Sequence, residues 1–246
     1  MLDIHCHILP GVDDGSPDIG VSLEMAEVLR DAGFRQIAAS PHYGEGSAGD
    51  VPIELASEKR MELSGALAEA GIELEILPNA EHHLRPSLFD RLDAGAVVPI
   101  GGDGKWLLVE LPWQPIPDPE KIIFRIQMKG YRVILAHPER YKYIEPPMVE
   151  RFVERGVLMQ IELGSFADLY GRRARKRALR YADKGQCHAM ATDLHHSKGA
   201  REWIADASKY VRKRYGDAGY ERVLAHNPKL LTQNADHLDV TPLSRK

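Results

Sequence analysis

Short apolar segments alternate with longer amphipathic ones along the chain, and this change of period predicts strands that alternate with helices. Seven of the short segments are rich in apolar and β-branched residues, which is typical of parallel strands covered on both faces. They are residues 2–5, 35–40, 73–77, 106–110, 132–136, 157–162 and 188–192. The alternation predicts an α/β fold built on a parallel sheet or barrel.

The amphipathic segments between the strands end as helices do. Each is followed by a glycine, the residue that most often terminates a helix: 21–32, 53–70, 119–129, 147–155, 172–184 and 200–215. No long Pro/Ser/Gly-rich linker divides the chain, so we expect one domain over residues 1–246. A barrel of seven strand–helix units is preferred. A doubly wound open sheet is the alternative, because periodicity cannot show whether a sheet closes.

Composition narrows the class of protein. The 246 residues are 43% hydrophobic and carry a net charge of -4, which excludes a disordered chain and argues against nucleic-acid binding driven by overall charge. Two cysteines, Cys6 and Cys187, cannot form a disulfide framework and favour a reducing compartment. No segment approaches about 18 consecutive apolar residues, and no leader precedes Asp3. We therefore expect a soluble, cytoplasmic protein.

Ligand-type side chains follow six of the seven predicted strands. In chain order they are His5, His7, Asp13 and Asp14; His42; Glu81, His82 and His83; Glu110; His137; and Asp193, His195 and His196. The carboxyl ends of parallel strands meet on one face, where active sites are built. So many imidazoles and carboxylates in one place would be costly to bury unless metal ions neutralised them.

Spacing separates the stronger candidates from the weaker ones. His5 and His7 alternate along an extended segment, so both imidazoles can face one ion while Cys6 faces away. With these two, His42, His137 and His195 are the preferred ligands. Asp13 and Asp14 compete for one role, for which Asp14 is favoured, and His82, His83 and His196 stay open. Glu162 is expected to support a ligand or to pack, and His188, His226 and His237 are expected to have ordinary structural roles.

Several stretches resemble one known family. The segment from Asp3 to Gly15 (DIHCHILPGVDDG) closely resembles the opening of the PHP (polymerase and histidinol phosphatase) superfamily. Within it, the resemblance is to bacterial manganese-dependent protein-tyrosine phosphatases of capsule and exopolysaccharide systems. AHPERY at 136–141, ATDLH at 191–195, the stretch 164–174 and NPKLL at 227–231 are similar to the same group.

This resemblance implies a distorted (β/α)7 TIM-like barrel that holds three divalent ions. Manganese is favoured, and iron, zinc, cobalt or magnesium are alternatives. Carried over position by position, the metal ligands are His5, His7, Asp14, His42, Glu81, Glu110, His137, Asp193 and His195. The sequence departs from the usual pattern of the family in two places, around Glu81 and at His196, which adds a second histidine beside His195.

The implied reaction is hydrolysis of a phosphotyrosine monoester by a metal-bridging hydroxide. Bound metal lowers the pKa of water from 15.7 to about 7, and a tyrosine phenolate, whose pKa is about 10, leaves with little acid assistance. Arg140 and Arg201 are the candidate catalytic residues, as a grip on the phosphate. Tyr43, Trp113 and Tyr141 are candidates to stack on the substrate ring. A cysteine nucleophile is excluded by spacing, because an arginine should follow six positions later, where Cys6 has Val12 and Cys187 has Asp193.

The resemblance also implies a partner, the phosphorylated tail of a bacterial tyrosine autokinase, and a role in regulating capsule or exopolysaccharide synthesis. The alternatives are a histidinol-phosphate phosphatase of the same superfamily and a non-catalytic phosphotyrosine-binding scaffold. A related amidohydrolase is disfavoured, because Glu110 stands where those enzymes commonly have lysine. The basic run from Arg172 to Arg180 could steer an acidic tail, but a solvated helix face is the preferred interpretation.

Overall fold

The computed structural model describes residues 1–45, 49–236 and 238–243. Within them every strand pairing is parallel, in two sheets with the orders β1-β2-β4 and β3-β5-β6-β7-β8-β9. The strands are β1 (Leu2–Cys6), β2 (Gln36–Ala39), β3 (His42–Tyr43), β4 (Glu75–Pro78), β5 (Glu81–His83), β6 (Trp106–Glu110), β7 (Arg132–Leu135), β8 (Leu158–Glu162) and β9 (Ala189–Ala191).

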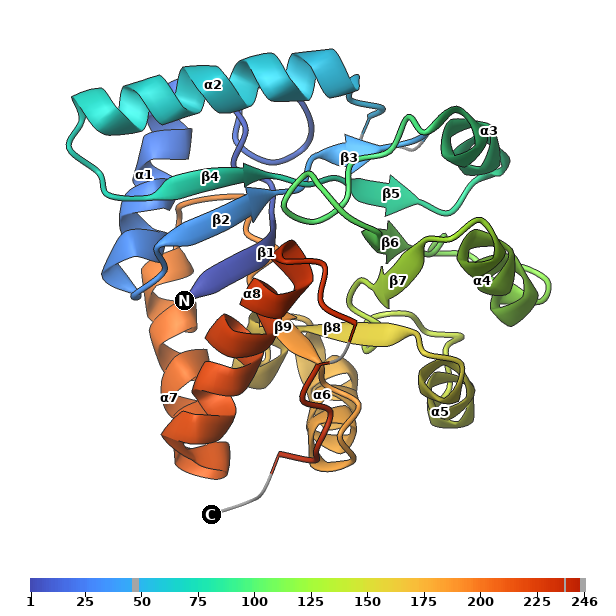
Figure 1. The fold of residues 1–246 in the computed structure, drawn as a ribbon. Coiled ribbons are helices and arrows are strands. Elements are labelled where there is room, and N and C mark those ends of the chain that lie inside the picture. Colours follow the sequence, from blue (N-terminus) through green and yellow to red (C-terminus); the bar gives the residue numbers. More distant parts are fainter. Residues whose placement is uncertain (46–48, 237, 244–246) are drawn as a thin grey trace.

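The two sheets make one curled array (Figure 1). Ser40 and Pro41 separate β2 from β3, and Asn79 and Ala80 separate β4 from β5, so each of these pairs occupies one strand position. The array returns on itself where the end of β1 meets the segment after β9: His7 N donates to Leu194 O at 3.0 Å and Asp193 N donates to His5 O at 2.8 Å. The predicted seven-stranded, distorted barrel is confirmed, and the open doubly wound sheet is not observed.

Helices cover the outside of this array (Figure 1). They are α1 (Ile19–Asp31), α2 (Ile53–Glu69), α3 (Pro86–Ala94), α4 (Pro119–Met128), α5 (Pro146–Glu154), α6 (Gly171–Asp183), α7 (Ala200–Glu221) and α8 (Asn227–Thr232), with a short 3-10 helix at Leu163–Ala167 and a π-helical turn at Arg222–His226. The pattern did not predict α3 and α8. At Gly216, the predicted end of a helix, the backbone leaves helical geometry at φ 78°, and the chain then continues as a second helical segment.

The core has two parts. Most buried apolar residues pack between strands and helices. A second cluster lies within the curl of the sheet, with Ile4, Ala38, Leu108 and Ile134 from four strands and Leu231 from α8. Figure 1 shows α8 beside β1. The cluster also includes Leu2, Trp106 and Leu158, the first residues of β1, β6 and β8, so it fills the barrel towards the amino ends of the strands. The carboxyl ends are thereby left for polar side chains.

Candidate metal centre

The first strand brings two imidazoles to the centre. Between the pairs Asp3–Ile37 and Cys6–Ala39, β1 has one residue more than β2, and this bulge lies beside His5. Both His5 and His7 are buried. His5 Nδ1 donates to Gln160 Oε1 at 3.0 Å, and the two Nε2 atoms lie 3.3 Å apart. The predicted HxH geometry is therefore present.

The loop after β1 distinguishes the two adjacent aspartates. Asp13 is directed at His7 Nδ1 (2.8 Å), and its other oxygen accepts from Gly15 N at 3.0 Å. Asp14 Oδ1 instead lies 3.1 Å from His42 Nε2 and 3.4 Å from His195 Nε2. The turn is tight, because a Cβ on Gly15 would meet His7 O at 2.2 Å. The geometry agrees with the preference for Asp14 as a ligand and gives Asp13 the task of orienting His7.

Glu81 lies at the middle of the cluster. Its carboxylate is 2.9 Å from His42 Nδ1, 3.1 Å from His137 Nε2, 3.3 Å from His5 Nε2 and 3.6 Å from His7 Nε2. It is almost completely buried. A carboxylate that reaches four imidazoles from three other strand ends is suited to bridge neighbouring cations.

His83 joins the same side of the cluster. Its Nε2 lies 2.8 Å from Glu110 Oε2 and 2.9 Å from His42 Nδ1. The sequence left His82, His83 and His196 undecided. The structure separates them, because His82 points elsewhere, with Nδ1 donating to Leu108 O at 3.0 Å, and His196 is exposed and belongs to none of the candidate ion-binding groups. The period-two alternation of β5 places Glu81 and His83 on one face and His82 on the other.

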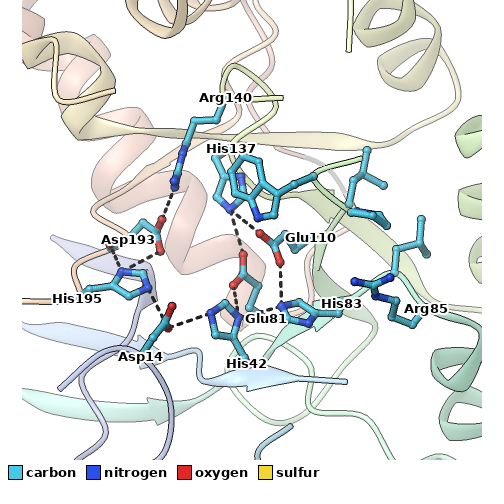
Figure 2. Close-up of a pocket in the computed structure, with 14 residues that line it drawn as sticks. Asp14, His42, Glu81, His83, Arg85, Glu110, His137, Arg140, Asp193 and His195 are labelled. Atoms are coloured by element: carbon cyan, nitrogen blue, oxygen red, sulfur yellow. Dashed lines mark hydrogen bonds and ion pairs between the residues drawn. The ribbon is translucent and has the colours of Figure 1, made fainter. Parts of the chain in front are cut away.

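Asp193 and Arg140 lie on the side of the cluster opposite His83 (Figure 2). Asp193 Oδ1 lies 3.1 Å from His5 Nε2, while Oδ2 accepts from Arg140 Nη1 at 2.9 Å. The same Nη1 atom donates to buried Glu162 at 2.6 Å. The expected supporting role of Glu162 is thus to hold Arg140. His137 and Asp193 have positive φ angles, 35° and 49°, a backbone strain that typically persists where the surrounding structure enforces it at functional sites.

Electrostatics point to a centre built for positive charge. Burial opposes charging of the imidazoles, yet the carboxylates Asp193 and Glu81 raise the pKa of His5 to about 10. Burial likewise opposes charging of His42, but Asp14 and Glu81 raise its pKa to about 11. The cause is a concentration of carboxylates in a dry site, which attracts protons or, equally, metal cations.

The hydrogen bonds also orient the imidazoles for cation binding. His5 and His7 direct their Nδ1 atoms outward, to Gln160 and Asp13. Their Nε2 atoms therefore face each other and the carboxylates, and in the neutral form each Nε2 carries the lone pair through which an imidazole binds a metal ion. Within the described residues, four groups could each hold an ion: His7, Asp14, His42 and His195; His42, Glu81, His83 and Glu110; His5, His137 and Asp193; and His5, His7 and Glu81. The donor set of imidazole nitrogens and carboxylate oxygens fits divalent transition metals.

A cavity of about 290 Å³ opens over this cluster. Figure 2 shows Asp14, His42, Glu81, His83, Glu110, His137, Asp193 and His195 around it, with Arg140 and Arg85 at different sides. Trp113 also lines the cavity, with its ring 5.6 Å from that of His137 and tilted by 9° from it, and it is half-exposed. Tyr43 and Tyr141 are buried, so Trp113 is the one of the three aromatic candidates that a ligand can reach.

Some candidates lie away from the cavity. Arg201, in the first turn of α7, pairs with Asp31 of α1 at 2.8 Å and does not line the cavity. The structure therefore does not support its predicted phosphate grip. His188 is buried beneath β8, where its Nδ1 accepts from Met159 N at 2.9 Å, and His237 lies outside the described residues. Most of the basic run is paired with acidic neighbours, as with Arg175 and Asp168 or Arg180 and Glu150.

The cysteines do not have the environment of a nucleophile. Burial raises the pKa of the Cys6 thiol well above its usual value, and the charge of Asp3 raises it further. Burial also raises the pKa of Cys187. Both are therefore protonated thiols. Among the described residues, no helix has the length and apolar character needed to span a membrane.

Known proteins resemble this chain over nearly its whole length. Residues 1–233 match the family described as capsular polysaccharide synthesis, CpsB/CapC. The tyrosine-protein phosphatase YwqE of Bacillus subtilis is 32% identical over 97% of this chain and 91% of its own. The tyrosine-protein phosphatase CpsB of Streptococcus agalactiae is 25% identical over 95% of this chain and 99% of its own.

One solved structure is also very similar. It comes from work on YwqE of Bacillus subtilis and CpsB of Streptococcus pneumoniae, described as unique metal-dependent tyrosine phosphatases, and superimposes with a TM-score of 0.87 at 30% identity, covering 100% of this chain and 97% of the other. A prolidase superimposes with a TM-score of 0.53 at 13% identity, over 99% of this chain and 76% of its own. That likeness concerns the fold alone.

Proposed function

This chain belongs to the CpsB/CapC family of capsular polysaccharide synthesis, and from that membership we propose that it is a metal-dependent protein-tyrosine phosphatase, a phosphoric monoester hydrolase. The observation that carries the proposal is the cluster of imidazoles and carboxylates at the floor of an open cavity. Its relatives YwqE and CpsB are tyrosine-protein phosphatases. The match at residues 1–233 also supports one PHP-type domain over residues 1–246.

Three divalent ions, with manganese favoured, would be held by nine ligands: His5, His7, Asp14, His42, Glu81, Glu110, His137, Asp193 and His195. Glu81 is the candidate bridging carboxylate, because it contacts His42, His137 and His5. When bound, the metals supply an activated water and neutralise charge on the phosphoryl group. With its metals bound, such a site would attract the dianion of a phosphate monoester through its positive charge.

Arg140 would bind the phosphoryl oxygens. Its Nη1 is engaged by Glu162 and Asp193, while no hydrogen bond within the described chain occupies its Nη2. Trp113 and Tyr170 flank the guanidinium, whose carbon lies 4.9 Å and 4.2 Å from the two ring centres. A guanidinium fixed in this way presents its remaining N–H groups in one orientation, which favours phosphate recognition.

Trp113 would receive the phenyl ring of the substrate. It lies at the cavity mouth, above His137, and is exposed enough to stack on an aromatic leaving group. No acidic side chain has to protonate a tyrosine phenolate on departure, because its pKa is near 10. An alkyl phosphate, such as histidinol phosphate, leaves as a much more basic alkoxide and would need a general acid.

The natural substrate we infer is a phosphotyrosine protein, specifically the tail of a bacterial tyrosine autokinase, whose dephosphorylation would regulate capsule or exopolysaccharide synthesis. The family description, capsular polysaccharide synthesis, supports this pathway. The two free, buried cysteines are compatible with a reducing cytoplasm.

The test is phosphate release from a phosphotyrosine peptide and from histidinol phosphate in parallel. Wild type and His5→Ala would each be assayed with Mn²⁺, with Zn²⁺ and with EDTA. We expect metal-dependent release that favours the peptide and is lost in His5→Ala. Preference for histidinol phosphate would refute the substrate, full activity after exhaustive chelation would refute the metal mechanism, and peptide binding without release would indicate a scaffold.

A further inference from the structure

The cavity over the metal centre is lined by two guanidinium groups with opposite electrostatic surroundings. Arg140 is held by Glu162 and Asp193. Arg85 is exposed, and within the described residues its side chain makes no hydrogen bond or ion pair. Figure 2 shows it beside His83, on the other side of the cavity from Arg140 and Asp193. The site therefore has an uncompensated positive charge at its rim.

Local structure holds Arg85 at this rim. It follows β5 by two residues, and its backbone N donates to His83 O at 2.9 Å. Its backbone is extended, and Pro86 directly after it begins α3. Proline restricts the preceding residue to extended conformations, so the base of the Arg85 side chain is fixed relative to His83 while the guanidinium stays in solvent.

The two arginines lie at different depths in the cavity, and this difference gives them different roles. Arg140 contacts Asp193 at the buried cluster, where a phosphoryl group would lie. Arg85 is exposed at the mouth, where the polypeptide on either side of a phosphotyrosine would run. Between mouth and floor the lining is partly apolar, with Leu84, Leu111 and Trp113, which suits a phenyl ring. An unpaired guanidinium at a mouth of this kind binds carboxylates through paired, charge-assisted hydrogen bonds.

We propose that Arg85 is a specificity-determining residue that binds an aspartate or glutamate next to the phosphotyrosine of the substrate. The proposal rests on the proposed phosphatase function and adds the class of sequence that the enzyme prefers. Arg85 contributes to binding the flanking residue and not to the chemical step. Its removal should therefore raise KM for acidic peptides and leave kcat unchanged.

The chain offers a matched control. Arg60 lies on α2, is likewise without an ion pair or side-chain hydrogen bond among the described residues, and does not line the cavity. Replacing Arg60 or Arg85 by glutamate changes net charge equally. Any difference between the two variants then reports position rather than overall charge. Both sites are at least partly exposed, so the fold should tolerate either change.

The experiment measures kcat/KM for wild type, Arg85→Ala, Arg85→Glu and Arg60→Glu with Mn²⁺. The substrates are N-acetyl-phosphotyrosine amide and phosphotyrosine peptides that carry one glutamate, one lysine or only alanines at positions −2 to +2. For wild type we expect kcat/KM about 10-fold higher with glutamate than with alanine at one or more of these positions. Arg85→Ala should abolish this preference, Arg85→Glu should reverse it towards lysine, and Arg60→Glu should keep it.

N-acetyl-phosphotyrosine amide separates the outcomes. Its hydrolysis should be equal in wild type and Arg85→Ala, because it has no carboxylate for Arg85 to bind. A large loss there would overturn the proposal by placing Arg85 at the phosphoryl group. Absence of an acidic preference in wild type, or its persistence in Arg85→Ala, would also overturn it. No hydrolysis of any substrate by wild type would instead refute the phosphatase function itself.

Discussion

Asp13 Oδ2 lies 2.8 Å from His7 Nδ1, whereas the adjacent Asp14 faces His42 and His195. Two neighbouring carboxylates thus have different surroundings: Asp13 holds the Nδ1 side of one imidazole, and Asp14 is directed at two other imidazoles of the candidate metal centre. Such outer partners of metal-binding histidines commonly matter 10- to 100-fold for affinity. The relationship leads to a prediction about metal binding.

Asp13→Asn should weaken Mn²⁺ binding by about 10- to 100-fold without unfolding the protein, since the amide cannot hold His7 with a full negative charge. Titration of phosphate release with Mn²⁺ measures the effect, and most activity should return at saturating metal. Asp31→Asn is the control, because Asp31 is an exposed partner of Arg30 and Arg201. Equal Mn²⁺ affinities of Asp13→Asn and wild type would contradict the assigned role.

Cys6→Ala should retain phosphatase activity. The thiol is buried, lies 3.7 Å from Leu194 O and has a raised pKa, so it has no route to act as a thiolate. Loss of a small buried side chain should cost about 1 kcal/mol of stability. Steady-state kinetics and urea unfolding check both effects. An inactive but fully folded Cys6→Ala protein would revive the cysteine mechanism.

Arg140→Leu should lower both stability and activity, and the two effects can be separated. Removing the guanidinium leaves Glu162 buried without its basic partner and takes one of several partners from Asp193, which should cost about 3 kcal/mol in the free energy of unfolding. Loss of the phosphate contact should reduce kcat/KM by about 100-fold. Urea unfolding in EDTA and kinetics with Mn²⁺ measure the two quantities.

Adding Glu162→Gln to Arg140→Leu supplies the control. Because the double variant replaces the carboxyl group of Glu162 by a neutral amide, it should regain part of the lost stability while staying impaired in catalysis. If its activity recovered together with its stability, Arg140 would be a structural residue only.

His188 predicts a pH dependence of stability. Burial lowers its pKa to about 4 from the usual 6.5, because the charged imidazolium would lose its hydration. Nδ1 also accepts from Met159 N, so a proton at Nδ1 would break that hydrogen bond. The unfolded chain binds a proton at His188 between pH 6.5 and 4, and the folded chain does not. The contribution of His188 is therefore complete above pH 6.5 and falls as the pH drops towards 4, by roughly 3 kcal/mol at most.

His188→Asn should reduce this acid sensitivity, since an amide does not titrate in this range. Urea unfolding of metal-free wild type and His188→Asn between pH 7.5 and 5 gives the comparison. Wild type should lose more stability than the variant over this interval. His226→Asn serves as the control and should follow wild type. Parallel pH profiles for wild type and His188→Asn would show that His188 is not held neutral in the fold.

The sequence by itself determined the alternation of parallel strands with helices and the candidate ligands, while closure of the sheet stayed open between a barrel and a doubly wound sheet. Apolar strand segments followed directly by His5, His7, Glu110, His137 and Asp193 place these side chains at the carboxyl ends of parallel strands, and the topology brings those ends together. Local alternation also predicted that His5 and His7 face the same way. Short-range periodicity suffices here, because a strand fixes side-chain direction two residues at a time.

The periodicity of the sequence did not predict the interruptions of two strands or the short helices α3 and α8. β3 and β5 have two and three residues, too few to show a period, and they exist because neighbouring strands pair with them. His83 was undecided for the same reason. Its place on the side of Glu81 follows from the alternation of β5, and this short strand is recognised only through its pairing with β6.

Only the tertiary structure decided the charge relationships. Arg140 and Arg201 each follow a ligand-bearing strand in the sequence, and Arg201 also fitted the alternative of an exposed helix residue. The packing of α7 against α1 brings Arg201 to Asp31, 170 residues away, while the closure of the barrel brings Arg140 to Asp193 and Glu162. Arg85 had no sequence signal, because being unpaired at a cavity rim is a property of its surroundings. Ion pairs depend on distances between remote segments, and these distances are set by how the helices pack once the sheet has closed.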